Sequence, residues 1–526
     1  MKKVLISDSI SPKGVEILKS AGLEVDVQTG LPPEELKKII GAYHGLVIRS
    51  ATKVTADIIS AAENLKVIGR AGSGLDNVDK AAATQKGIVV MNTPGGNTIT
   101  TAEHAMALLF SVARLIPQAT GSMRSGLWEK KKFMGVELFG KTLGIVGMGN
   151  IGAQVAKKAL GLDMNVLCYD PFLNEEKAKS LGVHCVGLEE LWKRADFITL
   201  HTPLTPETKY LVNAKSIAMM KDGVRIINCA RGGIVNEKDL LDALNSGKVA
   251  GAALDVFEKE PPTDNPLCTM EKVVCTPHLG ASTKEAQENV ALAVAEQVAD
   301  YLVGGIIRNA VNFPSIPPEQ VPLLSPYLKL AERMGGFASQ VFESGIKEIS
   351  IEYTGEASGL NTAPVTIAAV KGLLSPIMGE TVNFVNALVI AKERGIEIKE
   401  TKSSDAGDYR SMISLRIKGE KESSSISGTI FSKKDPRIIE VDGAPVEIIP
   451  EGTMLFMYNN DRPGLIGAVG TFLGSHGINI ARMFFGRESE GGTARSVVSI
   501  DSPLQPELIE ELKKIPNILS VRQVVL

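Results

Sequence analysis

The chain has 526 residues, 44% of them hydrophobic and 22% charged, an ordinary balance for globular domains that each bury a core. At ~100–200 residues per domain, this length predicts about three or four domains. The formal net charge of −3 excludes a general attraction to nucleic acid or to an anionic membrane. No apolar run reaches the ~18–20 residues that span a bilayer. The first residues resemble a strand rather than a secretion signal, so we expect a cytoplasmic protein.

Residues 3–95 alternate short apolar strands with helical segments, which is typical of a parallel sheet covered by helices. Residues 98–121 are predicted to form one long helix that begins with threonines suited to capping. Further strand–helix units follow from residue 141, and a helix after residue 282 closes this part of the chain. The first three hundred or so residues are therefore predicted to be α/β.

Four prolines within residues 309–322 predict a linker. Residues 323–450 beyond it predict a separate domain of helices and strands without a catalytic cluster. Residues 453–526 predict the order β-α-β-β-α-β. The five cysteines show no short paired spacing and the six histidines are scattered, so we expect reduced core cysteines and no metal site.

A glycine turn, "GMGNIG", follows the predicted strand "TLGIV" and opens a predicted helix. In that context Gly147 permits the tight turn, Gly149 admits a pyrophosphate, and Gly152 allows close packing of helix on strand. Asp170 ends the next predicted strand, where its carboxylate can bind ribose hydroxyls and repel a 2′-phosphate. The pattern predicts NAD rather than NADP, and a turn of glycines used only for packing is the alternative.

Arg231, Glu260 and His278 each follow a strand-like run. The carboxyl ends of parallel strands face the ligand crevice. A histidine can take the hydroxyl proton of a 2-hydroxy acid, a carboxylate can orient its ring, and an arginine can bind the substrate carboxylate. From the residues alone, a surface salt bridge and a histidine that merely ends a strand remain open.

Six blocks, among them "GRAGSGLDNVD", "NCARGGIVNE" and "TPHLGASTKEAQENV", resemble the D-isomer-specific 2-hydroxyacid dehydrogenases. Over essentially the whole chain the pattern is most similar to the long-form phosphoglycerate dehydrogenases. The resemblance implies a discontinuous substrate domain with an inserted Rossmann NAD domain. An intervening α+β domain and a ferredoxin-like ACT domain follow. The implied bounds are 1–97 with 283–309, 98–282, 310–451 and 452–526.

The same resemblance implies that Arg231, Glu260 and His278 are catalytic. It also implies contacts with NAD beyond the glycine turn and Asp170, from Asn150, Ile151, Thr202, Cys229, Ala230, Arg231, Asp255, His278, Gly280 and Ala281.

A phosphorylated acid requires cations for its phosphate and its carboxylate. Arg49 and Arg70 each follow a predicted strand, and turn amides near Arg70 can bind a carboxylate. The lysine run 130–132 is a third candidate, with a solvated charged face as its alternative. The candidate substrate residues are Arg49, Ser50, Arg70, Ala71 and Gly72.

The C-terminal segment "NNDRPGLIGAVGTFLGSHGINI" resembles an ACT domain. By that resemblance Asn459, Asp461 and Asn479 line an L-serine site between two copies of the domain. Asn459 departs from the histidine or tyrosine often found there, and a pure dimerisation module is the alternative. Trp128 resembles a subunit-contact tryptophan of the family, and its alternative is a local core anchor. A homotetramer is implied.

The implied function is NAD-dependent oxidation of 3-phospho-D-glycerate to 3-phosphohydroxypyruvate in L-serine biosynthesis, with feedback by L-serine. A glyoxylate or hydroxypyruvate reductase shares the catalytic blocks and is the first alternative. A non-catalytic NAD-sensing regulator on the same fold is the second alternative.

Overall fold

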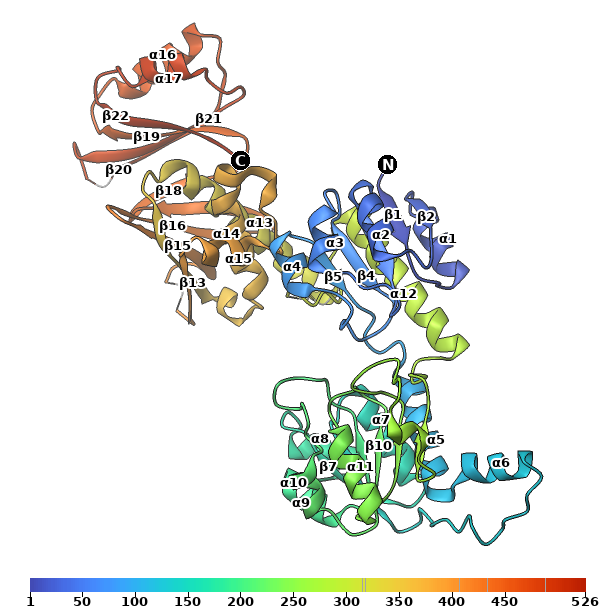
Figure 1. The fold of residues 1–526 in the computed structure, drawn as a ribbon. Helices are drawn as coiled ribbons and strands as arrows, with labels where there is room; N and C mark the ends of the chain where they lie inside the picture. The colour runs from blue at the N-terminus through green and yellow to red at the C-terminus, as the bar shows by residue number, and fades with distance from the viewer. Residues whose placement is uncertain (315, 317, 406, 433, 488) are drawn as a thin grey trace.

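The computed structural model describes residues 1–526 apart from 315, 317, 406, 433 and 488. The chain forms four sheets (Figure 1). The N-terminal sheet is parallel, in the order β2-β1-β3-β4-β5. Its strands are β1 (Lys3–Ile6), β2 (Glu24–Val27), β3 (Gly45–Ile48), β4 (Val67–Arg70) and β5 (Val89–Met91). Its helices are α1 (Pro12–Ser20), α2 (Pro33–Ile39), α3 (Ala56–Ala61), α4 (Lys80–Gln85) and α12 (Lys284–Gly304), with the 3₁₀ turn η1 (Ile40–Ala42).

Helix α12 comes after the second sheet in the sequence but packs on the first (Figure 1). Glycines make this close approach possible. A Cβ atom at Gly69 would lie 2.7 Å from side-chain atoms of Val294 and Val298. Val294 and Val298 are fully buried in the same apolar cluster as Val4. The second sheet is therefore inserted between two parts of the first unit.

The second sheet has seven parallel strands in the order β12-β11-β10-β9-β6-β7-β8. The strand order reverses between β6 and β9, and ligands bind at such a switch point. The strands are β6 (Thr142–Val146), β7 (Asn165–Tyr169), β8 (His184–Cys185), β9 (Phe197–Leu200), β10 (Val224–Asn228), β11 (Val249–Leu254) and β12 (Val273–Cys275). The helices are α5 (Thr98–Arg114), α6 (Ile116–Arg124), α7 (Asn150–Leu160), α8 (Glu175–Leu181), α9 (Leu188–Arg194), α10 (Ala214–Met219) and α11 (Glu237–Ser246), with η2 (Pro266–Thr269).

The prediction of one helix over residues 98–121 is wrong. The helix breaks at Leu115, whose φ of 54° is left-handed, and α5 and α6 meet at 66°. Pro117 explains the break, because its ring clashes with the carbonyl of the preceding helical turn. Within the described part of the chain no single helix is long and apolar enough to cross a membrane. Taken together, the bent pair α5–α6 has the length and apolar composition of a membrane span, but length and composition are the whole of that evidence.

The third sheet is mixed and the fourth is antiparallel. The third has the order β14-β13-β15-β16-β17-β18, and the fourth has β20-β21-β19-β22. Their strands are β13 (Ile346–Gly355), β14 (Glu397–Ser403), β15 (Ser411–Gly419), β16 (Ser423–Phe431), β17 (Asp435–Val441), β18 (Ala444–Ile448), β19 (Thr453–Asn460), β20 (Ile480–Arg487), β21 (Thr493–Ile500) and β22 (Ile518–Val525). Their helices are α13 (Val321–Val341), α14 (Ala363–Met378), α15 (Ala387–Glu393), α16 (Leu465–Ser475) and α17 (Pro506–Leu512), with η3 (Pro318–Gln320), η4 (Glu356–Gly359) and η5 (Gly379–Thr381).

The predicted β-α-β-β-α-β order of the last segment is confirmed, and so is the α/β fold class. One face of the fourth sheet is covered by α16 and α17. The other face packs on the domain that contains the third sheet. The rings of Phe337 on α13 and Phe456 on β19 meet edge to face at 5.4 Å. The last two sheets therefore share one core.

The predicted linker is partly structured. Ala310 bridges Met91 in antiparallel fashion, so the segment before α13 lies along the edge of β5. Ser315 and Pro317, which the linker prediction includes, lie outside the described residues.

The expectation that all five cysteines are core residues is wrong. Cys168 and Cys229 are buried, Cys185 and Cys268 are exposed, and all five are free thiols. Cys168 and Cys185 are paired in register on β7 and β8, and their Sγ atoms lie 3.1 Å apart. Burial and the neighbouring Cys185 thiol raise the pKa of Cys168 to about 12.

Candidate functional site

The glycine turn joins β6 to α7 as predicted, and each glycine has a physical reason. Gly147 has a φ of 96°, in the left-handed region that favours glycine. A Cβ atom at Gly152 would lie 2.0 Å from the Gly147 carbonyl oxygen, so only glycine lets the helix start this close to the strand. A Cβ atom at Gly149 would meet no heavy atom within 4 Å, which leaves open space in front of the turn.

Asp170 follows β7 and faces the same turn. Its Oδ2 accepts a hydrogen bond of 2.7 Å from the Met148 amide, and its Oδ1 accepts one of 2.8 Å from the Phe172 amide. These bonds fix the carboxylate beside the turn. A carboxylate oxygen has further lone pairs, so the predicted contact with ribose hydroxyls stays compatible with them.

The turn fits a dinucleotide. Helix α7 begins at Asn150, and Ile151 follows, so the amides of its first turn have no intrahelical partner. Thr202 stands beside Gly147, and its buried Oγ1 has no hydrogen-bond partner among the described residues. A buried hydroxyl without a partner is costly, and a bound ligand can supply that partner. The assignment of these residues to NAD contacts remains a prediction.

The variants Gly149→Ala and Gly152→Ala distinguish an effect on NADH binding from an effect on folding stability. The open space at Gly149 accommodates a methyl group in the free protein but places it where the pyrophosphate approaches. We expect Gly149→Ala to fold normally and to weaken NADH binding about tenfold or more, a loss of about 1.4 kcal/mol. Gly152→Ala clashes with backbone, so we expect it to lower the melting temperature as well. NADH fluorescence titration and thermal unfolding of both variants measure this, and equal melting points would contradict it.

Two of the three predicted catalytic residues, His278 and Glu260, meet beyond the carboxyl ends of strands in the second sheet. His278 Nδ1 lies 2.8 Å from Glu260 Oε2, although the two residues come from separate loops after β12 and β11. Nδ1 is thereby committed to the carboxylate, and Nε2 is the ring nitrogen left to exchange a proton with substrate. The histidine and the carboxylate are both partly exposed, at 52% and 39% of their side chains. Substrate can therefore reach them.

Asp255 holds the loop that carries His278. Its carboxylate accepts hydrogen bonds from the amides of Leu279, at 2.7 Å, and Gly280, at 2.8 Å. Thr276 Oγ1 donates to it at 2.6 Å, and the backbone amide of His278 donates to the Asp255 carbonyl at 2.9 Å. Asp255 is 1% exposed. Its predicted contact with NAD stays a prediction, whereas its support of this loop is observed.

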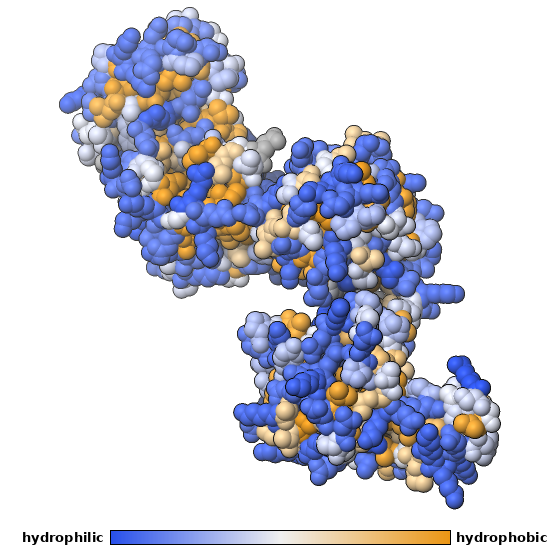
Figure 2. Space-filling model, in the orientation of Figure 1, coloured by the Kyte–Doolittle hydropathy of each residue, from blue (hydrophilic) through white to orange (hydrophobic). Residues whose placement is uncertain are grey.

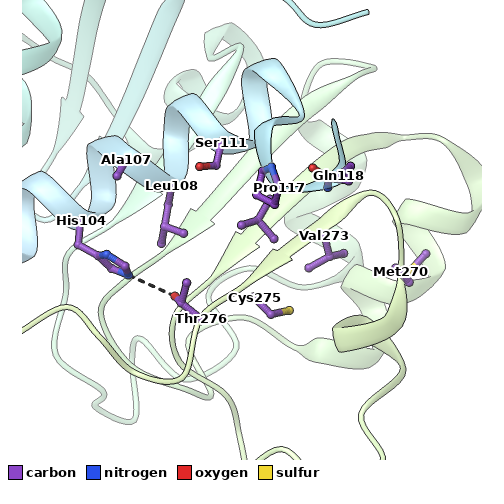
Figure 3. Close-up of a pocket in the computed structure, with 11 residues that line it drawn as sticks. His104, Ala107, Leu108, Ser111, Pro117, Gln118, Met270, Val273, Cys275 and Thr276 are labelled. Carbon is purple, nitrogen blue, oxygen red and sulfur yellow. Dashed lines mark hydrogen bonds between the residues drawn. The ribbon is translucent and has the colours of Figure 1, made fainter. Parts of the chain in front are cut away.

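His104 on α5 completes this network and was not predicted. Its Nε2 lies 3.2 Å from both Thr276 Oγ1 and Asp255 Oδ1. Burial acts to raise the pKa of Asp255, but the bonds from His104, Thr276 and Leu279 outweigh it and hold that pKa below its ordinary value. Figure 3 shows His104 pointing at Thr276 from α5, at one end of a groove of about 510 Å³ between that helix and β12.

None of the predicted catalytic residues, Arg231, Glu260 and His278, lines the groove in Figure 3, so the groove is separate from them. Cys229, at 5% exposure, and Ala230 lie at the end of β10 on the crevice side. Cys229 Sγ approaches Asp255 Oδ2 at 3.6 Å. His104, Cys229 and Asp255 offer donor atoms within 4.8 Å of one another, but burial and the Asp255 charge raise the pKa of the Cys229 thiol. A protonated thiol is a poor metal ligand.

The substrate-side cations gather at the carboxyl edge of the N-terminal sheet. Arg49 follows β3 and Arg70 ends β4. The pKa of Arg70 is lowered by burial first and then by the positive charge of Arg231, with a further contribution from Arg49. Ser50 is exposed next to Arg49. The positive charges of Arg49, Arg70 and Arg231 therefore lie near enough to influence one another, and we call these three residues the positive region.

Arg231 reaches the N-terminal unit from the second sheet. Its Nε donates to Asp76 Oδ2 at 3.0 Å, and its Nη2 would lie 2.3 Å from a Cβ atom at Gly74. Asp76 was not predicted, and nothing in the local sequence distinguishes it from a solvated aspartate. The contact places the loop after β4, a candidate for substrate binding, directly against Arg231, a candidate catalytic residue of the second sheet.

The amides of Ala71 and Gly72 donate within the protein, to the Ile48 carbonyl and to Thr93 Oγ1, both at 2.8 Å, so a substrate carboxylate would have to displace these bonds. A Cβ atom at Gly72 would lie 2.7 Å from Arg70 Nη1, and Gly72 has a φ of 147°. The lysine run 130–132 is elsewhere, after α6 on an arm that projects from the second sheet (Figure 1). Lys132 Nζ lies 3.3 Å from Glu271 Oε1. A contact of this run with substrate stays a prediction, and the solvated charged face remains its alternative.

The predicted effector residues do not converge within one chain. Asp461 follows β19 and accepts from Arg487 and Gly491, whereas Asn479 precedes β20 and donates to Asp501 at 2.8 Å. The two lie at opposite ends of the fourth sheet, because β19 and β20 both run antiparallel to β21. Asn459 is 2% exposed and its Oδ1 accepts from Ser496 at 2.6 Å.

Three family models match the chain. They are the NAD-binding domain of D-isomer-specific 2-hydroxyacid dehydrogenases at residues 106–280, the D-3-phosphoglycerate dehydrogenase intervening domain at 323–442, and the ACT domain at 453–517. The D-3-phosphoglycerate dehydrogenase of Methanocaldococcus jannaschii is 47% identical over 99% of both chains. The chain belongs to the D-3-phosphoglycerate dehydrogenase family.

Two further relatives agree with this. The D-3-phosphoglycerate dehydrogenase of Bacillus subtilis is 43% identical over 99% of both chains. The structure of D-lactate dehydrogenase from Aquifex aeolicus, complexed with NAD and lactic acid, is 30% identical. It superposes with a TM-score of 0.52, covering 59% of this chain and all of that one. Family membership confirms the prediction of an NAD-binding 2-hydroxyacid dehydrogenase with intervening and ACT domains.

Proposed function

We propose that the protein oxidises 3-phospho-D-glycerate to 3-phosphohydroxypyruvate with NAD, and that L-serine regulates it. Two observations support the proposal: the hydrogen-bonded His278–Glu260 pair on the second sheet, and the contact of Arg231 with Asp76 of the N-terminal domain. His278 and Glu260 come from the second sheet, and Arg70 and Arg49 come from the first. Arg231 joins the two through Asp76.

The proposed chemistry divides between the two sides of the crevice. Arg231 binds the substrate carboxylate and orients the carbon that carries the hydroxyl. His278 Nε2 takes the hydroxyl proton, and Glu260 stabilises the ring as it becomes positively charged. NAD, when bound on the glycine turn, accepts the hydride from the same carbon. In the reverse direction His278 returns the proton to the 2-oxo acid.

The positive region favours a phosphorylated acid over glyoxylate or hydroxypyruvate. A substrate with a single carboxylate needs one guanidinium group, and Arg231 serves that purpose. Arg70 has a buried Nε with no partner among the described residues, and Arg49 gives only one hydrogen bond from its side chain, 3.2 Å long, to the Ser9 carbonyl. A second anionic group on the substrate can satisfy both. The phosphate is therefore assigned to Arg49 and Arg70.

The proposed serine site requires two copies of the chain. Asp461 and Asn479 are at opposite ends of one sheet, so the Asp461 end of one copy must meet the Asn479 end of another. Strand β20 lies at the edge of the sheet order, where a second copy can approach. Asn459 is buried and we propose that it supports the strand rather than touching serine. A module that only assembles subunits is the alternative.

The arm around α6 supports a homo-oligomer, which we propose to be a tetramer in the cytoplasm. Trp128 is 79% exposed, Met134 81% and Phe139 71%. The arm extends beyond the second sheet (Figure 1), and the face seen in Figure 2 is otherwise mostly hydrophilic with separate apolar patches. Large exposed apolar side chains in one segment mark a contact surface. A second copy of the chain is the partner proposed for it.

NADH oxidation with 3-phosphohydroxypyruvate, with and without millimolar L-serine, tests the proposal. We expect turnover that serine suppresses. Turnover insensitive to serine would leave the catalytic assignment and reduce the ACT domain to assembly. Activity on hydroxypyruvate or glyoxylate but not on the phosphorylated acid would contradict the roles of Arg49 and Arg70. Binding of NADH without any turnover would favour a sensing regulator.

A further inference from the structure

The intervening unit touches the N-terminal sheet beside strand β5. Asn383, in the loop before α15, donates from Nδ2 to the carbonyl of Gly87 at 2.8 Å. The contact is close, because a Cβ atom at Gly87 would lie 2.2 Å from that same Nδ2. Val385 is 7% exposed and belongs to the same apolar cluster as Val89 and Met91 of β5. The intervening domain therefore contacts the start of β5 through both a hydrogen bond and apolar packing.

The chain segment that leads to the intervening domain forms hydrogen bonds along the outer edge of β5. Asn312 Oδ1 accepts from the Val90 amide at 2.9 Å, and its Nδ2 donates to the Ile88 carbonyl at 2.8 Å. The Val311 amide donates to the Val90 carbonyl at 2.9 Å. Strand β5 is the last strand in its sheet, so these bonds cover an edge that would otherwise have no partner.

The other end of β5 holds the loop that we assign to substrate. Thr93 Oγ1 accepts from the Gly72 amide at 2.8 Å, and the Thr93 amide donates to the Gly72 carbonyl at 3.1 Å. Asn92 Nδ2 donates to the Ser73 carbonyl at 2.6 Å. These bonds fix the loop that follows Arg70, one of the two arginines assigned to the phosphate.

We propose that Asn383, Gly87 and Asn312 form a joint through which the intervening unit positions the substrate loop. A short strand is stiff along its length, so a displacement at Gly87 reaches Asn92 and Thr93. The third and fourth sheets share one core, so a change in the ACT domain can also reach Asn383. Asn383 is in this sense a positioning residue, and the inference rests on the function proposed above.

Gly87→Ala tests the joint, and Gly22→Ala is its matched control. Both glycines end a turn after a helix of the N-terminal unit with nearly the same φ, 76° and 80°. A Cβ atom at Gly22 would meet no heavy atom within 4 Å, whereas at Gly87 it displaces Asn383. The two variants therefore carry the same backbone strain, and only one breaks the joint.

We expect Gly87→Ala to raise KM for 3-phosphoglycerate about fivefold or more over Gly22→Ala, within the usual range of coupling between sites. The KM for NAD should agree within about twofold between Gly87→Ala and Gly22→Ala, because the glycine turn that we assign to NAD lies on the other sheet. Hydrogen exchange of the amides of residues 71–73 and 88–93 should also be faster in Gly87→Ala. Equal KM values and equal exchange in the two variants would overturn the proposal.

Asn383→Asp provides a second test that leaves both glycines in place. The aspartate keeps the oxygen that accepts from the Val385 amide at 2.9 Å but loses the donor to Gly87. Asn213→Asp is its control, since Asn213 Oδ1 likewise accepts from two nearby backbone amides and its Nδ2 donates to the Tyr210 carbonyl at 2.7 Å, here within the NAD domain. Only Asn383→Asp should raise KM for the phosphorylated acid. Absence of wild-type turnover would refute the proposed function. Hydrogen exchange alone would then test whether the contact of Asn383 with Gly87 positions the substrate loop.

Discussion

His278→Ala is expected to lower kcat about 10³- to 10⁴-fold while the dissociation constant for NADH changes less than about threefold. A positioned general base contributes ~10²–10⁴-fold to rate, and here one histidine serves both directions of the reaction. His278 is not packed in a core, because its side chain is 52% exposed, so its removal should leave the fold intact. Stopped-flow NADH oxidation and a fluorescence titration measure the two quantities separately.

Glu260→Gln is the companion variant for this prediction. The glutamine retains an oxygen that can accept from His278 Nδ1, now 2.8 Å from the carboxylate, but it carries no charge. We expect a loss in kcat of about 10²-fold, smaller than the loss for His278→Ala, because the ring stays oriented while its protonated form loses its counter-charge. If His278→Ala lost NADH binding and turnover equally, the histidine would be a structural residue instead.

The cofactor turn was predictable because its signal is local. Gly147, Gly149 and Gly152 lie within one strand–turn–helix unit, and the constraints on them come from their immediate neighbours. The predicted catalytic residues lie far apart in the sequence, yet a general rule predicts that they lie close together in the fold. Each follows a strand, and parallel strands end at one edge of the sheet. The structure puts His278 and Glu260 in hydrogen-bond contact.

Contacts between units left no comparable signal. Asp76 meets Arg231, and Asn383 meets Gly87, only because the sheets pack in one particular way. His104 supports the loop before His278 from α5, but this helix also carries Glu103 and three threonines, so its sequence does not single out the histidine.

Two features had signals in the local sequence that the predictions did not use: the burial of Asn459 and the break between α5 and α6. In β19 the residues Leu455 and Met457 face α16 and α17, and alternation places Asn459 on that same buried face. The continuous apolar run of β19 likewise indicated burial on both faces, which the packing of Phe456 on Phe337 explains. Pro117 signalled the break between α5 and α6.

Arg231→Ala is expected to lower kcat/KM for 3-phosphoglycerate about 10³-fold, about 4 kcal/mol of transition-state stabilisation. Arg231 follows β10 of the second sheet, and its Nε reaches across to Asp76 in the loop after β4, which we assign to substrate. Arg231→Lys keeps the charge but loses the planar fork that binds a carboxylate with two parallel bonds. We expect it to recover less than about a tenth of the lost activity.

Asp76→Asn decides whether that loss comes from substrate binding or from the contact between the two units. It removes the charge opposite Arg231, whose Nε lies 3.0 Å from Asp76 Oδ2 and whose side chain is 33% exposed, and leaves the arginine in place. An exposed pair of this kind contributes ~0–1 kcal/mol, so we expect Asp76→Asn to change kcat/KM less than about fivefold. A loss as large as that of Arg231→Ala would mean that the arginine acts by holding the two units together. A small loss, with the dissociation constant for NADH unchanged in both variants, would place its action on the substrate carboxylate.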